Sequence, residues 1–269
     1  MPEIARRTLL KTAAGAALLT AMPGSARAAT FDPAKIKVMA FDFQGSCVDY
    51  TGPLMAMGAE INQKKGLDLD WGAISSDWRD AYHEVMVPVL AHQKAYVSTD
   101  QVYRQALDPV LEKHHLSDRF SPAERDEMAT IWGRMVPWPD TIEGLTRLRR
   151  RYTLTTLSNG SMATVIKMVK ANHIPFDEVL TGELAQNYKP APEVYALLPQ
   201  MMGVQRDEIL FGATHFYDLE AAKKFGFWTA WWPRPLEYGP NHQIDFAPKP
   251  YVDIYAKDLV ELAGMLGAA

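Results

Sequence analysis

Cysteine is nearly absent from this sequence, because Cys47 is the only one among 269 residues. No disulfide can form within the chain, so the core alone must stabilise the fold, and we expect Cys47 to pack there as a small apolar side chain. Apolar runs of the ~18 to 20 residues that cross a bilayer are also absent. The net charge of −4 and the lack of a basic cluster interleaved with aromatic residues argue against nucleic acid as a partner.

The N-terminus has the composition of an export signal. A pair of arginines, Arg6 and Arg7, precedes a short apolar run, and a small-x-small triplet ends at Ala28. This order is typical of a cleaved signal peptide, and the paired arginines resemble the twin-arginine export signal. We therefore predict a signal peptide over residues 1–28 and a periplasmic location. The alternative is a short amphipathic helix or a membrane anchor, although the run is too short to span a bilayer.

Short apolar segments alternate with helical periodicity after Thr30. The apolar segments have the length of buried strands, and the stretches between them, such as TIEGLTRLRRR and SMATVIKMVKANH, place apolar residues three and four positions apart. This alternation predicts an α/β fold with a doubly wound parallel sheet. The strands are expected at residues 36–41, 152–158, 178–180, 208–212, 227–232 and 251–255.

One interval is too long for a single crossover helix. Between the first two strands, four stretches with helical periodicity follow one another, and two of them begin at residues that favour helix starts, Ser98 and Ser121. We predict a helical cap domain inserted after the first strand, over residues 54–136, and a core domain made of residues 32–53 and 137–269. The helices are expected within residues 53–66, 71–93, 98–115 and 121–135.

Polar side chains stand where four of the predicted strands end. In chain order they are Asp42, Ser158, Lys189 and Asp218. Each of them alone is more often a helix cap, a turn former or a solvated side chain. In an open parallel sheet, however, ligands bind at the carboxyl ends of the strands, so four such residues in series predict one site.

The order of these four residues resembles the motifs of the haloacid dehalogenase superfamily, which are a nucleophilic Asp, a Ser or Thr, a Lys and a second acid. The stretches FDFQGS, LSNGS, YKPAPEVY and FGFWTAWWPRP resemble in particular its L-2-haloacid dehalogenase branch. In the predicted cap, Trp78-Arg79 resembles a pair whose Arg binds the substrate carboxylate. The resemblance covers nearly the whole chain after the predicted signal, and it implies a hydrolase with a cap on a doubly wound core.

The residue two places after Asp42 separates two kinds of chemistry. Phosphatases of this superfamily carry an Asp there that protonates the departing alkoxide, and their carboxylates bind Mg²⁺. This chain has Gln44 instead. A halide leaves as a stable anion and needs no proton, so the missing acid favours cleavage of a carbon–halogen bond. The resemblance thus implies a dehalogenase that converts 2-haloalkanoic acids to 2-hydroxy acids without a metal or another cofactor.

The resemblance also implies a two-step mechanism. Asp42 attacks C2 of the substrate and displaces the halide, which leaves an aspartyl ester. Lys189 keeps Asp42 ionised, and Asp218 assists the attack of water on the ester. The catalytic residues that it implies are Asp42, Lys189, Asp218 and Ser158.

A substrate-binding group follows from the same resemblance. Arg79 and Ser158 hold the carboxylate, and Asn159 together with Arg79 faces the departing halide. Tyr217 walls the alkyl pocket, and Tyr195 hydrogen-bonds within the catalytic network. A small halogenated carboxylic acid is the expected partner, and a homodimer is one expected assembly. The whole group comprises Arg79, Asn159, Ser46, Gln44, Tyr195, Tyr217, His215 and His83.

Three of these residues have simpler interpretations that the sequence leaves open. Arg79 forms a surface ion pair with Asp80 or Glu84 if it behaves like most helical arginines. In the simpler interpretation of Tyr195, it is an ordinary aromatic residue of the core. In that of Asp218, it caps the helix that begins near Leu219.

Four positions depart from the usual residues of the branch. Gln44 replaces an aromatic residue, His83 an apolar one, Ala213 a Ser and His215 an Asn. Because they line or support the expected pocket, substrate size and halogen preference stay open. His215 is either a histidine locked by a backbone hydrogen bond or a residue that positions the hydrolytic water or the leaving halide.

Two other functions compete with dehalogenation. The first is a Mg²⁺-dependent phosphatase of the same superfamily, which would hydrolyse phosphoesters until EDTA removed the metal. The second is a periplasmic carboxylate-binding protein that kept the fold and lost turnover, which the replaced pocket residues suggest.

Overall fold

The computed structural model of the protein describes residues 30–239 and 243–268, and the predicted signal peptide, residues 1–28, lies outside them. Phe31–Ala269 is one compact unit, and only this unit is described below. Within the described ranges, no helix is both long and apolar enough to cross a membrane.

A six-stranded sheet forms the centre of the unit, and every neighbouring pair of strands in it is parallel. The order of the strands confirms the predicted doubly wound α/β fold, because the chain builds one half outward from β1 before it returns to build the other. Across the sheet the strands are β5 (Glu178–Thr181), β4 (Thr153–Ser158), β1 (Val38–Phe41), β6 (Ile209–Ala213), β7 (Trp228–Trp231) and β8 (Ile254–Tyr255).

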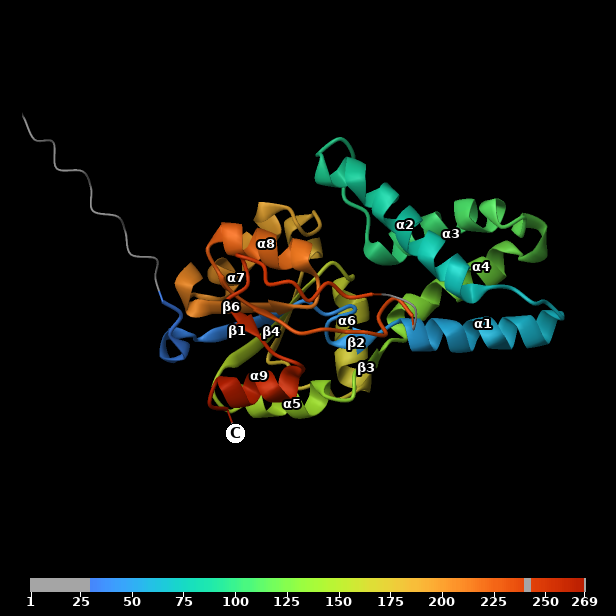
Figure 1. The fold of residues 1–269 in the computed structure, drawn as a ribbon. Helices are drawn as coiled ribbons and strands as arrows, with labels where there is room; N and C mark the ends of the chain where they lie inside the picture. Colours follow the sequence, from blue (N-terminus) through green and yellow to red (C-terminus); the bar gives the residue numbers. More distant parts are fainter. Residues whose placement is uncertain (1–29, 240–242, 269) are drawn as a thin grey trace, which may run out of the picture. The chain divides into compact units, whose positions relative to one another are not determined.

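Alternate residues of β1 pack on opposite faces of the sheet, as the two-residue period of a strand requires. Met39 and Phe41 belong to a core that includes side chains of three helices beside the sheet and of the helices between β1 and β4, and Val38 and Ala40 belong to a second core with side chains of two others. Figure 1 shows the two layers on either side of the strands. The first layer is α5 (Thr141–Arg149), α6 (Met162–Ala171) and α9 (Leu259–Met265), and the second is α7 (Pro192–Met202) and α8 (Phe216–Phe225).

Four helices follow β1, as the sequence predicts, although the division into cap and core domains stays a prediction. An aromatic cluster joins the second and third of them to the turn after the fourth: the Tyr103 ring stacks on Trp132 at 4.0 Å, and the Trp78 indole donates to the Tyr103 carbonyl at 2.8 Å. The helices are α1 (Thr51–Lys65), α2 (Trp71–Leu90), α3 (Thr99–Lys113) and α4 (Pro122–Ala129). Short 3₁₀ turns cover Pro33–Lys35, Ser117–Arg119, Thr130–Gly133, Gly182–Ala185 and Arg206–Glu208.

A second, two-stranded sheet was not expected from the sequence. β2 (Val48–Asp49) pairs antiparallel with β3 (Val136–Pro137), and neither segment is among the predicted strands. Two-residue strands are too short to show an alternating pattern. The pairing continues into the loop after β1, because the Trp138 indole donates to the Gly45 carbonyl at 2.7 Å. Cys47, in the same loop, is fully buried, as predicted.

Candidate active site

Three of the four residues predicted to form one site meet at the carboxyl edge of the large sheet. The Lys189 ammonium donates to Asp42 Oδ1 at 2.8 Å and to Asp218 Oδ2 at 2.5 Å. Asp42, Lys189 and Asp218 are 5%, 2% and 0% exposed. An ammonium group therefore bridges two carboxylates almost out of contact with water.

The loops after the central strands hold these groups in place. Asp42 follows the last residue of β1, and its backbone N–H donates to the Gly212 carbonyl of β6 at 2.9 Å. The Asn159 side chain, just after β4, accepts from the Lys189 backbone N–H at 2.7 Å. Ser158 Oγ is fully buried and accepts from the Gly160 N–H at 3.0 Å. Asn159 thus positions the Lys189 backbone, and Ser158 shapes the turn beside it.

Burial and pairing act in opposite directions on the three charges. Burial opposes ionisation of Asp42, but Lys189 and then His215 outweigh it and hold the pKa of Asp42 well below its usual range. Burial raises the pKa of Asp218, and the charge of Lys189 offsets this only in part. The two carboxylates raise the pKa of Lys189 despite its burial. Asp42 is therefore the ionised acid of the pair, and Asp218 is the more readily protonated one.

The second oxygen of Asp42 has its own pair of neighbours. Ser46 Oγ donates to Asp42 Oδ2 at 2.6 Å, and it accepts from the Thr214 N–H at 3.0 Å. His215 Nδ1 lies 3.0 Å from the same Oδ2. Two residues assigned to substrate binding from the sequence, Ser46 and His215, therefore contact the carboxylate of Asp42 itself.

Glu237 completes this side of the cluster, and the sequence analysis missed it. Its Oε1 lies 2.6 Å from His215 Nε2, and the residue is 2% exposed. Burial disfavours the charge of His215, but Glu237 and then Asp42 raise its pKa well above the usual value. Glu237 follows β7 within the stretch WWPRPLEY, so the strand-end argument that found Asp42 would also have pointed to it.

Arg79 lies among aromatic rings rather than on the surface. Its guanidinium carbon is 4.7 Å from the centre of the Tyr50 ring, and Nη1 donates to the Tyr103 hydroxyl at 3.4 Å. Its Nε is buried and has no hydrogen-bond partner among the described residues. Within those residues Arg79 also forms no ion pair with Asp80 or Glu84, so the interpretation as a surface ion pair is wrong.

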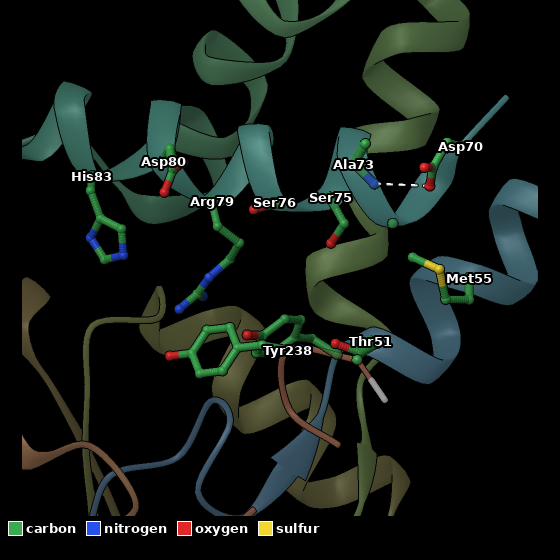
Figure 2. Close-up of a pocket in the computed structure, with 13 residues that line it drawn as sticks. Thr51, Met55, Asp70, Ala73, Ser75, Ser76, Arg79, Asp80, His83 and Tyr238 are labelled. Carbon is green, nitrogen blue, oxygen red and sulfur yellow. Dashed lines mark hydrogen bonds between the residues drawn. The ribbon is translucent and has the colours of Figure 1, made fainter. Parts of the chain in front are cut away.

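A cavity of about 520 Å³ opens beside Arg79. Arg79 and His83 extend into it from α2, and the Arg79 side chain points toward the segment that carries Tyr238 (Figure 2). Burial and the neighbouring Arg79 lower the pKa of His83 to about 4, so His83 is neutral at neutral pH. The lining residues are Tyr50, Thr51, Met55, Asp70, Gly72, Ala73, Ser75, Ser76, Arg79, Asp80, His83, Tyr238 and Gly239.

Two of the predicted tyrosines lie in different surroundings. The Tyr195 hydroxyl donates to Asp218 Oδ1 at 2.5 Å, and its ring is buried, so Tyr195 is both a core aromatic and part of the network. Asp218 accepts from Tyr195 and Lys189 and does not cap α8, whose N-cap is His215. Tyr217 is 47% exposed, lies beside the His215 ring, and is not among the residues that line the cavity.

Gln44 and Ala213 are the two remaining positions that depart from the usual residues of the branch. Ala213 ends β6 and is fully buried. The Gln44 amide carbon lies 3.6 Å from where a Cβ on Gly160 would stand, so Gln44 faces the turn after β4 that carries Ser158 and Asn159. Among the described residues, no three His, Cys, Asp or Glu side chains are grouped so that they could hold a metal ion.

Comparison with known proteins places this geometry in a family. The family model for haloacid dehalogenase-like hydrolases matches residues 82–232. (S)-2-haloacid dehalogenase 4A from Burkholderia cepacia is 28% identical over 217 residues, which cover 79% of this chain and 88% of that protein.

Two crystal structures are similar over most of the chain. An L-2-haloacid dehalogenase is 32% identical, with a TM-score of 0.81, and the match covers 87% of this chain and 100% of that one. A defluorinating L-2-haloacid dehalogenase is 33% identical, with a TM-score of 0.82, over 86% of this chain and 95% of that one. The motif order, the parallel sheet and these matches agree, and the chain belongs to the haloacid dehalogenase-like hydrolase family.

Proposed function

We propose that the protein is a hydrolytic dehalogenase that converts 2-haloalkanoic acids to 2-hydroxy acids through an ester on Asp42. The observation that carries the proposal is the Asp42 carboxylate, which Lys189 keeps ionised in a nearly dry site with Gln44 where a phosphatase has its proton donor. The relatives named above as (S)- and L-2-haloacid dehalogenases support the same reaction class.

In the first step, a carboxylate oxygen of Asp42 attacks C2 of the substrate in line and the halide departs with the bonding electrons. Burial of the nucleophile removes the water that would otherwise weaken it. Arg79 holds the substrate carboxylate, and its buried Nε, which has no hydrogen-bond partner among the described residues, is a donor suited to that task. Asn159 and Arg79 face the departing halide, and no proton is needed.

In the second step, water attacks the ester carbonyl carbon of Asp42 and releases the 2-hydroxy acid. Asp218 takes the proton of the attacking water, which suits a carboxyl group whose pKa is raised by burial. Tyr195 and Lys189 hold the two oxygens of Asp218, so its orientation is fixed before the water arrives.

Halide release from L- and D-2-chloropropionate, chloroacetate and fluoroacetate, with and without EDTA, tests the proposal. The wild type should release halide in the presence of EDTA, and Asp42→Asn should not. EDTA-sensitive hydrolysis of a phosphoester would show a phosphatase instead. Tight binding of the carboxylate without halide release would show a binding protein.

We also propose that residues 1–28 direct export of the folded chain to the periplasm by the twin-arginine route. The support is the order of Arg6-Arg7, the apolar run and the small residues before Ala29. Replacing both arginines with lysine should retain the protein in the cytoplasm of the producing cells. Unchanged recovery from the periplasmic fraction would contradict the proposal.

A further inference from the structure

The two oxygens of the Asp42 carboxylate are not equivalent. Oδ2 lies at hydrogen-bond distance from two side chains, Ser46 Oγ at 2.6 Å and His215 Nδ1 at 3.0 Å. Oδ1 accepts from Lys189 alone among the described residues. A carboxylate oxygen has two in-plane lone pairs, so Oδ2 is fully occupied whereas Oδ1 retains one lone pair for attack on carbon.

His215 is held from both sides. Glu237 Oε1 lies 2.6 Å from Nε2, and Asp42 Oδ2 lies 3.0 Å from Nδ1. The other titratable groups near its ring are Tyr217 on its own helix and His83 on α2. His83 is neutral at neutral pH, and a tyrosine hydroxyl is protonated there, so both charges facing His215 are negative. This arrangement favours an imidazolium that donates from both ring nitrogens.

We propose that His215 is a catalytic residue of ester hydrolysis, which together with Ser46 donates hydrogen bonds to Asp42 Oδ2 as that oxygen becomes negatively charged, while Oδ1 is the atom that bonds to substrate. Glu237 is the positioning residue that fixes the His215 ring. The inference rests on the proposed function and extends it to the second step.

Hydrolysis of the ester consumes one water molecule. The water oxygen bonds to Cγ of Asp42, its proton passes to Asp218, and the carbonyl electron pair moves onto Oδ2 between the Ser46 and His215 donors. When the pair returns, the Cγ–Oδ1 bond breaks, and Oδ1 leaves with the product and takes the proton back from Asp218. The new Asp42 carboxyl group loses its remaining proton to solvent, so one proton and one halide are released in each cycle.

A role as general base does not fit this geometry. A base needs an imidazole nitrogen with a free lone pair within reach of water. Both nitrogens of His215 are directed at carboxylate oxygens, and its side chain is 9% exposed. A donor role uses the hydrogen bond that already exists and requires no rearrangement as the charge develops.

Two substitutions of His215 separate the two chemical steps. His215→Phe keeps a ring and removes both donors, and His215→Asn keeps a neutral donor near the position of Nδ1. In rapid-quench experiments we expect ester hydrolysis to slow by about 10²–10³-fold in His215→Phe and by less in His215→Asn, the usual cost of losing an oxyanion donor. The first step should keep its rate, because Lys189 still ionises Asp42. Both variants should therefore show a burst of one halide per site and a protein mass increased by the carboxyalkyl group of the substrate.

The matched control is His173→Asn, the same exchange at an exposed histidine with φ 52° after α6, a backbone conformation that Asn tolerates. It should leave both steps unchanged. Equal slowing of the two steps in the His215 variants, or no slowing of hydrolysis, would overturn the inference. A wild type that releases no halide would instead overturn the proposed function itself.

Glu237→Gln tests the positioning residue and is the variant to use if the His215 variants do not fold. Glutamine keeps a hydrogen-bonding side chain of the same length and removes the charge. The hydrolysis rate depends on protonated His215, which is the form that donates from both ring nitrogens, so the rate should fall at alkaline pH. In Glu237→Gln this alkaline limb of the pH–rate profile should move to lower pH by about one to three units, as expected for loss of an adjacent charge. An unmoved alkaline limb would contradict the inference, because a merely structural role of Glu237 would change the rate without moving it.

Discussion

Lys189 is the residue on which the charge balance of the site depends. It is 2% exposed and bridges Asp42 and Asp218, and each carboxylate is buried too. Removing one partner from such a cluster leaves an uncompensated charge in a medium that solvates it poorly. A substitution of Lys189 should therefore affect the stability of the fold as well as ester formation.

Lys189→Met should lose halide release and also lower the free energy of unfolding by about 3–5 kcal/mol at neutral pH. The deficit should shrink in acid. Because the pKa of Asp42 is lower in the folded protein than its usual value, ionised Asp42 stabilises the fold at pH values above that usual pKa. This contribution is lost as the pH falls through the pKa of Asp42 in the folded protein. Urea unfolding at several pH values measures this. Lys224→Met, which breaks an exposed pair with Glu220, is the control and should have little effect; equal losses in both variants would contradict the account.

Arg79 offers a second test at the level of one side chain. Its flat guanidinium lies against the Tyr50 ring, with Nε buried beside the cavity, and a lysine supplies neither the fork nor that donor. Arg79→Lys should raise KM for a 2-haloacid by about ten- to a hundredfold, the worth of a hydrogen bond to a charged group. Steady-state kinetics measure it. Arg149→Lys, at an exposed pair with Asp177, should leave KM unchanged. Equal KM values in the two variants would exclude Arg79 from carboxylate binding.

The residues that the sequence predicted and the one it missed differ in how they are encoded. Asp42, Lys189 and Asp218 each stand in a recognisable order at a strand end, and the structure brings them together. Glu237 has no motif, because its role arises from a loop that returns to the edge of the sheet, 22 positions after His215. Its place after β7 makes it a candidate, but its contact with His215 joins two loops, and that proximity is a tertiary property that a linear pattern does not contain.

The turn that follows β1 is the element that connects the nucleophile to the His215–Glu237 pair. Gly45 has φ +85°, and a Cβ placed there would lie 2.2 Å from Glu237 Oε1. The Gly45 carbonyl also accepts a hydrogen bond from the Trp138 indole, which connects the turn to the residue that follows β3. The glycine thus meets two requirements at once, a left-handed backbone and a close approach of Glu237.

Gly45→Ala should therefore both destabilise the protein and slow ester hydrolysis, because the methyl group displaces Glu237 from His215. The control is Gly66→Ala at the end of α1, where φ is +63° and no atom lies within 4 Å of the added Cβ. That change should cost about 1–2 kcal/mol of stability from backbone strain and leave turnover intact. Denaturant unfolding and rapid-quench kinetics on both variants measure the difference. A Gly45 variant that behaves like the Gly66 variant would show that the close contact is unimportant.

At the level of elements, the large sheet and the helices were predictable because their apolar patterns extend over enough residues to reveal a period. The paired segments β2 and β3 were not, since each has two residues and includes a proline or a carboxylate. Their pairing depends on contacts across about ninety positions of sequence, such as the hydrogen bond from the Thr141 hydroxyl to the Cys47 carbonyl.

At the scale of the whole molecule, the site is assembled from segments that span most of the described chain. The charged cluster uses residues from Asp42 to Glu237, and the cavity uses α1, α2 and the segment around Tyr238. Every one of these residues lies within Phe31–Ala269, the unit that contains the sheet and both cores. The described residues of the site therefore all belong to one compact unit.

A variant that begins at residue 30 should fold and turn over like the full chain. Among the described residues, the contacts that form the sheet, the cores and the charged cluster join residues between Phe31 and Ala268. The melting temperature and the rate of halide release, compared between the two proteins, measure this. A lower melting temperature or a slower rate in the shortened protein would show that the N-terminal residues contribute to the active unit.

The central claim is that Asp42 forms a covalent ester, and the fate of its oxygen tests this most directly. With enzyme in excess over a 2-haloacid in H₂¹⁸O, a single turnover should give a 2-hydroxy acid whose new hydroxyl carries ¹⁶O from Asp42 Oδ1. The peptide that contains Asp42 should gain one ¹⁸O. Mass spectrometry of product and peptide reads both. A first-turnover product that carries ¹⁸O in its hydroxyl, with an unlabelled Asp42, would show direct displacement by water and contradict the account.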